Sequence, residues 1–128
     1  MKYYISKTIN VAFDEVVEMI TASLKTEGFG ILTEINIKDT LKTKLNVDFR
    51  KYKILGACNP VFAHKALQEE DKIGTMLPCS VIVQEIDDSR TEVAAIDPVA
   101  AMMAVENPAV TGFANEVREK LLRAVGSL

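Results

Sequence analysis

The chain has 128 residues, of which 48% are hydrophobic and 26% are charged, with six glycines, four prolines and no tryptophan. This length and balance fit one globular domain that folds without disulfides or a structural metal. They exclude collagen-like, disordered and disulfide-scaffold proteins. Fifteen basic against eighteen acidic side chains give a net charge of −3. Because phosphate binding needs a basic surplus, this balance argues against nucleic acid or an anionic membrane surface as the partner.

The amino-terminal residues carry no sign of secretion. The first ten, MKYYISKTIN, alternate polar and apolar side chains and lack the apolar core of a signal peptide. No stretch approaches the roughly 20 apolar residues that a membrane span needs. Two cysteines in such a chain are most simply reduced thiols. We therefore expect a cytoplasmic protein.

Hydrophobic periodicity divides the first half of the chain into alternating strands and helices. Alternation over residues 3–9 predicts a strand, and an apolar stripe from Phe13 to Leu24 predicts a helix. Asn10 is the expected cap of that helix and Gly28 its stop. A strand over 29–37 and a helix over 39–45 are predicted next; the helix turns Leu41 and Leu45 inward and stops at Asn46. A strand over 52–58 follows, and then a helix that starts at Asn59-Pro60 and turns Ala63, Ala66 and Leu67 inward.

The second half predicts a hairpin followed by helices. Residues 78–86 and 91–96 form the hairpin, and the continuous apolar run at 81–83 predicts a central strand covered on both faces. Asp97-Pro98 and Asn107-Pro108 are expected helix starts. The last helix carries its apolar stripe on Val110, Phe113, Val117, Leu121 and Val125. The whole chain, 1–128, is therefore predicted to be a single α+β domain of two layers, with helices packed on a mostly antiparallel or mixed sheet of about five strands.

Two cysteines stand at the ends of predicted elements. Cys58 ends a strand directly before Asn59-Pro60, and Cys79 begins a strand directly after Pro78. Because a helix N-terminus stabilises a thiolate and its free amides bind small anions, Cys58 is the better candidate for a reactive thiol. The alternative is that both cysteines are small apolar core residues, which is the commoner role of a free cysteine.

Other chemical signals are weak. His64, the only histidine, would complete a zinc site with both cysteines and Asp97 or water, but a solvated surface histidine is the simpler interpretation. A basic cluster between Lys42 and Lys53 predicts a solvated face. No GxSxG, HExxH or GxGxxG motif is present, so the sequence identifies no catalytic residue, metal or cofactor.

Four blocks carry a resemblance to a known family. They are YKILGACNP at 52–60, IGTMLPC at 73–79, VIVQE at 81–85 and AIDP at 95–98. With GFGILTEINIKDTLKTKLNVDF at 28–49 they resemble a conserved microbial family catalogued as domain of unknown function 302, over nearly the whole chain. Ser80 stands where the family pattern favours asparagine. The resemblance implies helices on a mostly antiparallel sheet and a homodimer. It also implies that the family's motifs share Cys58, Asn59, Pro60, Pro78, Cys79 and Asp97.

Two functional hypotheses follow. The first is a small cytosolic homodimer that binds a small ligand or a partner without catalysing a reaction. Its pocket would lie where Cys58, Asn59 and Pro60 meet Cys79 and Asp97, and helix-start amides beside a thiol would capture a small anionic or soft group. The expected dimer contact is apolar surface on a terminal helix. The alternative is a thiol-redox or metal-binding protein that uses Cys58 and Cys79 together.

Overall fold

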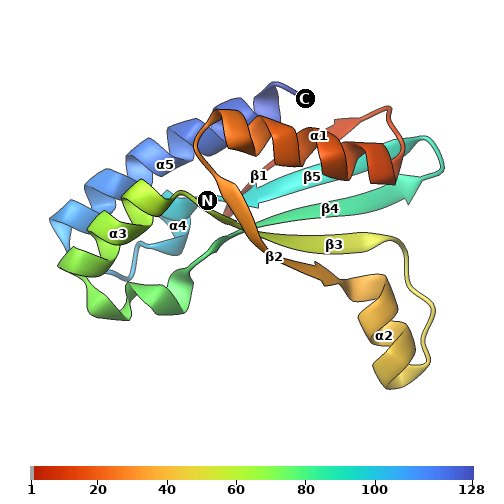
Figure 1. Cartoon of the computed structure of the whole chain (residues 1–128), viewed down its shortest axis with the longest axis horizontal. Coiled ribbons are helices and arrows are strands. Elements are labelled where there is room, and N and C mark those ends of the chain that lie inside the picture. Colours follow the sequence, from red (N-terminus) through yellow and green to blue (C-terminus); the bar gives the residue numbers. More distant parts are fainter. Residues whose placement is uncertain (1) are drawn as a thin grey trace.

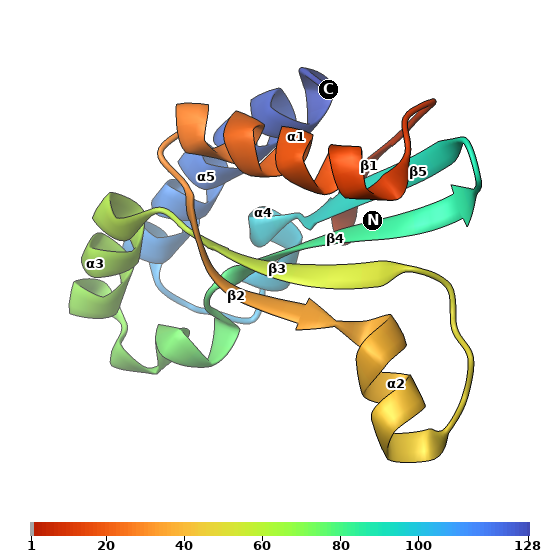
Figure 2. The same ribbon diagram turned by 45° about the vertical axis from the view of Figure 1, so that its right-hand side comes forward.

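The computed structural model describes residues 2–128 and confirms the α+β prediction. Its centre is one antiparallel five-stranded sheet of order β1-β5-β4-β3-β2, and α1 and α5 lie side by side on one face of it (Figures 1 and 2). The elements are β1 (Tyr4–Ile9), α1 (Phe13–Thr26), β2 (Gly30–Asn36), α2 (Ile37–Leu45), β3 (Tyr52–Cys58), α3 (Pro60–Glu69), the 3-10 helix η1 (Asp71–Met76), β4 (Cys79–Asp87), β5 (Arg90–Ile96), α4 (Pro98–Ala101) and α5 (Pro108–Gly126). The sequence had not predicted η1.

The three Asx-Pro pairs start helices as predicted. The side-chain oxygens of Asn59, Asp97 and Asn107 accept backbone N–H groups at the starts of α3, α4 and α5. Proline follows each of them at a position where its missing N–H is not needed by the helix. The predicted Asn10 cap of α1 is wrong: the N-cap is Ala12, which makes no side-chain cap bond, because Asn10 lies two residues too early.

Helix α2 differs most from its prediction. It ends at Asn46 in the expected left-handed conformation. None of its side chains is buried, however, and Leu45 is 66% exposed rather than turned inward. The reason is its place: α2 continues from edge strand β2 and projects beyond the sheet, so no second layer lies beneath it (Figures 1 and 2). On α3, Ala66 is buried as expected, but Leu67 is exposed.

Only one face of the sheet is covered by helices. Val81 and Val83 of β4 are fully buried against the α1–α5 layer, whereas Ile82 between them points to the other face and is half-buried. The expectation that β4 is covered on both faces is therefore wrong. Alternate residues of β3, β4 and β5 contribute to the core beneath the helices, which also includes Phe13, Ile20, Leu24, Phe29 and Leu121.

Gly56 marks a point of close approach inside β3. A Cβ atom built there would lie 2.8 Å from Pro78 Cγ and closer still to Thr33 Oγ1 of β2. The pairing of β2 with β3 shifts register between Ile31 and Thr33, opposite this glycine. The β2–β3–β4 end of the sheet is thus packed too tightly for any side chain at position 56.

Within residues 2–128 no helix combines the length and the apolar character that crossing a bilayer would require.

Candidate functional site

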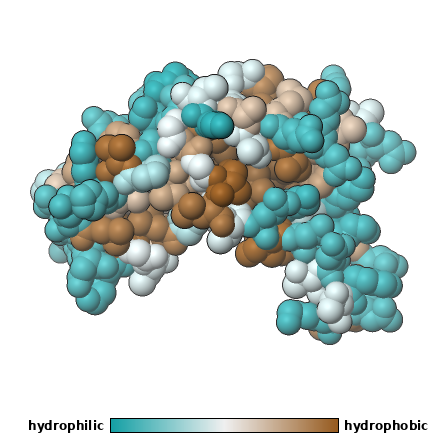
Figure 3. Space-filling model, viewed as in Figure 1, coloured by the Kyte–Doolittle hydropathy of each residue, from teal (hydrophilic) through white to brown (hydrophobic). Residues whose placement is uncertain are grey.

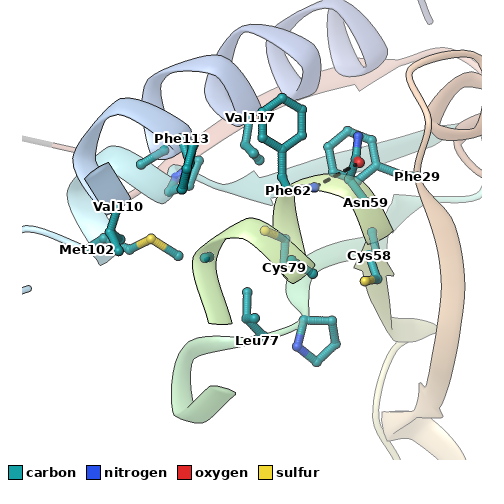
Figure 4. Close-up of a pocket in the computed structure, with 16 residues that line it drawn as sticks. Phe29, Cys58, Asn59, Phe62, Leu77, Cys79, Met102, Val110, Phe113 and Val117 are labelled. Atoms are coloured by element: carbon teal, nitrogen blue, oxygen red, sulfur yellow. Dashed lines mark hydrogen bonds between the residues drawn. The ribbon is translucent and has the colours of Figure 1, made fainter. Parts of the chain in front are cut away.

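The candidate site is an apolar cavity where the ends of β3 and β4 meet α3, α4 and α5 (Figure 4). Its volume is about 40 Å³, room for about three water molecules. About 480 Å³ of empty space is reached when the part open to solvent is included. The lining is almost entirely apolar, and its larger side chains are Phe29, Phe62, Leu77, Met102, Val110, Phe113 and Val117.

The cavity exists because small residues face each other across the α3–α5 contact. Ala63 and Ala66 line it from α3, and Ala114 lines it from α5. The aromatic rings of Phe62 and Phe113 pack between the same two helices, with their centroids 6.5 Å apart. Three methyl groups therefore stand where larger side chains would close a core.

The two cysteines both line the cavity but point in different directions. Ala57 of β3 pairs with Cys79 of β4, so Cys58 is one residue out of that register. Because side chains alternate along a strand, Cys79 points into the core and Cys58 points to the opposite face, as the sulfur atoms in Figure 4 show. Burial, and in second place the nearby Cys58, raises the pKa of the Cys79 thiol to about 11. Cys79 is therefore a protonated, apolar lining group at neutral pH.

Asn59 lines the cavity, yet both ends of its amide are occupied. Its Oδ1 accepts the Phe62 N–H at 3.5 Å, and its Nδ2 donates to the Glu27 carbonyl at 3.4 Å. The side chain thereby joins the end of α1 to the start of α3. Pro60 follows as the first residue of α3, is exposed, and does not line the cavity.

Asp97 lies outside the cavity and is occupied by structural bonds. Its carboxylate accepts the N–H groups of Val99 and Ala100 at 3.0 and 3.5 Å and the Arg118 Nε at 3.0 Å. The open surface pocket that Asp97 lines also contains Arg118 and has a mainly polar wall, separate from the cysteines. Only the next residue, Pro98, reaches the apolar cavity. The structure thus places Cys58, Asn59 and Cys79 on the lining of one cavity, which neither Pro60 nor Asp97 reaches.

The remaining sequence candidates are surface groups. His64 is exposed, as the simpler interpretation predicted. Within residues 2–128, no three His, Cys, Asp or Glu side chains are placed to hold a metal ion. In the basic cluster, Lys42 pairs with Asp48, Lys53 pairs with Glu34, and Arg50 donates to Gln84. Lys42 and Lys53 therefore have carboxylate partners, whereas the Arg50 guanidinium is bonded to a neutral amide.

The sequence did not reveal the cavity wall. Val110, Phe113 and Val117 were predicted as part of a core stripe, which they are, but the stripe faces alanines on α3 rather than large side chains. The feature of the sequence that could have indicated the cavity is the pair Ala63 and Ala66, which lies opposite Ala114 on another helix. That signal requires knowing that α3 packs on α5, which the order of elements does not give.

Comparison with known proteins places the chain in a structural group. The model of the family "Domain of unknown function DUF302" matches residues 5–128. The fold is similar to a crystal structure of an uncharacterized conserved protein DUF302 from Bacillus stearothermophilus, with a TM-score of 0.90, 26% sequence identity and 98% of each chain covered. No curated protein matches the sequence.

Proposed function

The chain belongs to the DUF302 family, and on the geometry of its apolar cavity we propose that it is a cytoplasmic, homodimeric protein that binds a small ligand through the ligand's apolar end. The observation that carries this proposal is the character of the cavity wall. Its lining is almost wholly apolar, and within residues 2–128 no buried side-chain nitrogen or oxygen lacks a hydrogen-bond partner. No buried polar group is left for a polar ligand to satisfy, so the bound part of the ligand is hydrocarbon-like.

The size of the cavity sets the size of the guest. The cavity volume of about 40 Å³ is far below the roughly 150 Å³ of an engineered cavity that holds benzene. A linear chain of a few carbon atoms fits the enclosed part, and the rest of the molecule extends toward the open side. Each buried methylene adds about 0.8 kcal/mol, which is about a fourfold gain in affinity.

The anionic ligand expected from the sequence finds support outside the cavity rather than within it. The ammonium groups of Lys65 and Lys120 lie 5.6 and 6.0 Å from the centroid of the Phe62 ring, which lines the cavity. Among residues 2–128 neither ammonium group lies within 4 Å of a carboxylate. A carboxylate attached to a short alkyl chain matches this arrangement: the chain enters the apolar space, and the charge stays near the two lysines.

Titration with straight-chain carboxylates of four to ten carbons, beside alcohols of equal length, tests this proposal. Binding is followed on the methyl signal of Met102, which lines the cavity, in protein carrying carbon-13 methionine methyls. The dissociation constant is expected to fall about fourfold per methylene until the chain fills the space, then to level off. Replacing both Lys65 and Lys120 with glutamine should weaken the carboxylates and leave the alcohols unchanged.

A filling variant provides the matched comparison. Ala114→Val places two further carbon atoms in the cavity and should weaken binding at least about tenfold, because the guest and the side chain compete for the same space. Ala22→Val makes the same change at an exposed position of α1 and should not alter binding. Equal binding to the wild type and to Ala114→Val would show that the ligand does not use the cavity.

No observation favours the thiol-redox or metal alternative. Cys79 is protonated at neutral pH, its sulfur and that of Cys58 point to opposite faces of the sheet, and the described residues contain no metal-ligand cluster.

A further inference from the structure

The face of the sheet that α1 and α5 leave uncovered is apolar in its centre. An exposed face of an antiparallel sheet ordinarily alternates toward polar side chains. Here a central set of the side chains that point away from the helices is half-buried and mostly apolar: Tyr4, Tyr52, Ile54, Ile82, Ala94 and Ile96. Ser6 and Ser80 point the same way and are exposed. A groove of about 370 Å³ runs across this surface, and all of the half-buried side chains in this set except Ile54 line it. We call this surface the open face.

The strand register orders the open face into rows. Ile54, Ile82 and Ala94 lie directly opposite one another on β3, β4 and β5 and form an apolar central row. The neighbouring row toward the hairpin contains Gln84 and Glu92, whose side chains are hydrogen-bonded at 2.7 Å. An apolar centre with a polar margin is the arrangement found in protein interfaces.

The accessible surface of the chain is larger than that of a typical monomer. It amounts to 7432 Å², whereas a monomeric protein of 14.1 kDa exposes about 6,700 Å². The excess of about 700 Å² is close to the roughly 800 Å² that each partner buries in a standard interface. Figure 3 shows apolar residues over the middle of the molecule continuing into the hollow between α3 and α2.

We infer that a second copy of this chain packs on the open face, so that two sheets lie face to face around a two-fold axis near Ile82. This inference rests on the homodimer of the proposed function and specifies its contact surface. It places the contact on the sheet instead of the terminal helix that the sequence had suggested. Two sheets packed in this way bring their strands within about 30° of each other at a spacing of about 10 Å.

The charges of the open face favour a like partner. In a two-fold contact every charge meets a copy of its own surroundings, so an interface with a net charge repels itself. Arg50 donates to Gln84, and Gln84 donates to Glu92, so one positive and one negative group belong to the same chain of bonds. The margin is thus neutral, and two identical faces approach without repulsion.

Sedimentation and light scattering across a concentration series test the inference with Ile82→Arg. An unpaired guanidinium at the centre of a two-fold contact meets its own copy, so the dissociation constant of the dimer should rise at least about 100-fold. Leu67→Arg, which makes a comparable change on the exposed side of α3, should leave it unchanged. Circular dichroism and the urea midpoint verify that each variant is folded. Ala94→Glu serves as the second central variant if Ile82→Arg does not fold.

A mixing experiment separates the two levels of the claim. Ile82→Arg and Ile82→Glu should each be monomeric, and their equimolar mixture should dimerise, because opposite charges then meet at the axis. A dimer that persists unchanged in Ile82→Arg or Ala94→Glu overturns the open face as the contact and leaves the homodimer standing. If the wild-type chain is monomeric at 100 times the protein concentration used for the variants, both the open-face contact and the homodimer are overturned. The carboxylate titration still tests ligand binding in the cavity independently.

Discussion

Gly56→Ala offers the sharpest test of how the β2–β3–β4 end of the sheet is packed. The new methyl carbon would stand 2.8 Å from Pro78 Cγ and would overlap Thr33 Oγ1. The Thr33 hydroxyl is exposed and rotates away at little cost, but the pyrrolidine ring of Pro78 is fixed to the backbone just before β4. The backbone must therefore shift, and overpacking of this kind costs about 2 kcal/mol.

A glycine in the adjacent strand supplies the control. A Cβ atom at Gly30 of β2 meets nothing within 4 Å, so Gly30→Ala should change stability by no more than about 0.5 kcal/mol, in the stabilising direction, by restricting the unfolded chain. In the double variant Gly56→Ala with Thr33→Ala, little of the loss should return, because the clash with the fixed Pro78 ring remains.

The free energies of unfolding are measured by urea titration with circular dichroism, and melting temperatures provide a second readout. For a chain of this length, 2 kcal/mol corresponds to about 7 °C. The slope of the urea curve should be unchanged, since the unfolded surface is the same. If Gly56→Ala were as mild as Gly30→Ala, the sheet would be able to open at this point, and the argument from close packing would be refuted.

Two further perturbations follow from the bonds around the site. Between pH 9 and 11 the Cys79 thiol ionises in the unfolded chain, while burial keeps it protonated in the folded chain. The stability of the wild type should therefore fall by up to about 2.7 kcal/mol more than that of Cys79→Ala. Urea titrations at each pH measure this difference. Asp97→Ala removes both the α4 cap and the ion-pair partner of Arg118, and should cost about 2 kcal/mol of stability in urea titrations. Asp97→Asn keeps the cap and should cost less than half of that. Equal losses in the two variants would mean that the ion pair, not the cap, dominates.

Local chemistry explains why most of the fold was predictable. The strand over 52–58 and the left-handed stop at Asn46 depend on side-chain alternation and on the conformational preference of one residue. Each Asx-Pro helix start likewise needs only neighbouring residues. The prediction of Leu45 as inward failed because the stripe on α2 gives its periodicity but not whether a second layer lies beneath it.

The candidate site was harder to predict because it is a product of tertiary packing. The chain neighbours of Cys58 and Cys79 placed both thiols at strand ends, and the β3–β4 pairing does bring them to one region. The direction of each sulfur depends on a one-residue offset in register that the sequence does not contain. The cavity itself arises where Ala66 and Ala114 meet across two helices. The prediction placed Asp97 beside the thiols, whereas the fold turns its carboxylate to Arg118, outside the lining of this cavity.

The pairing of β1 with β5 has a consequence during synthesis. Tyr4 lies opposite Ile96, so the first strand must wait until about 90 further residues have been translated before its partner exists, an interval of roughly 5–20 seconds at ordinary elongation rates. Until then β1, with Ile5 and Ile9 on its core side, has no hydrogen-bonding neighbour in the native sheet. On a ribosome, the hydrogen-bonding edge of this strand therefore stays unpaired until β5 has been made.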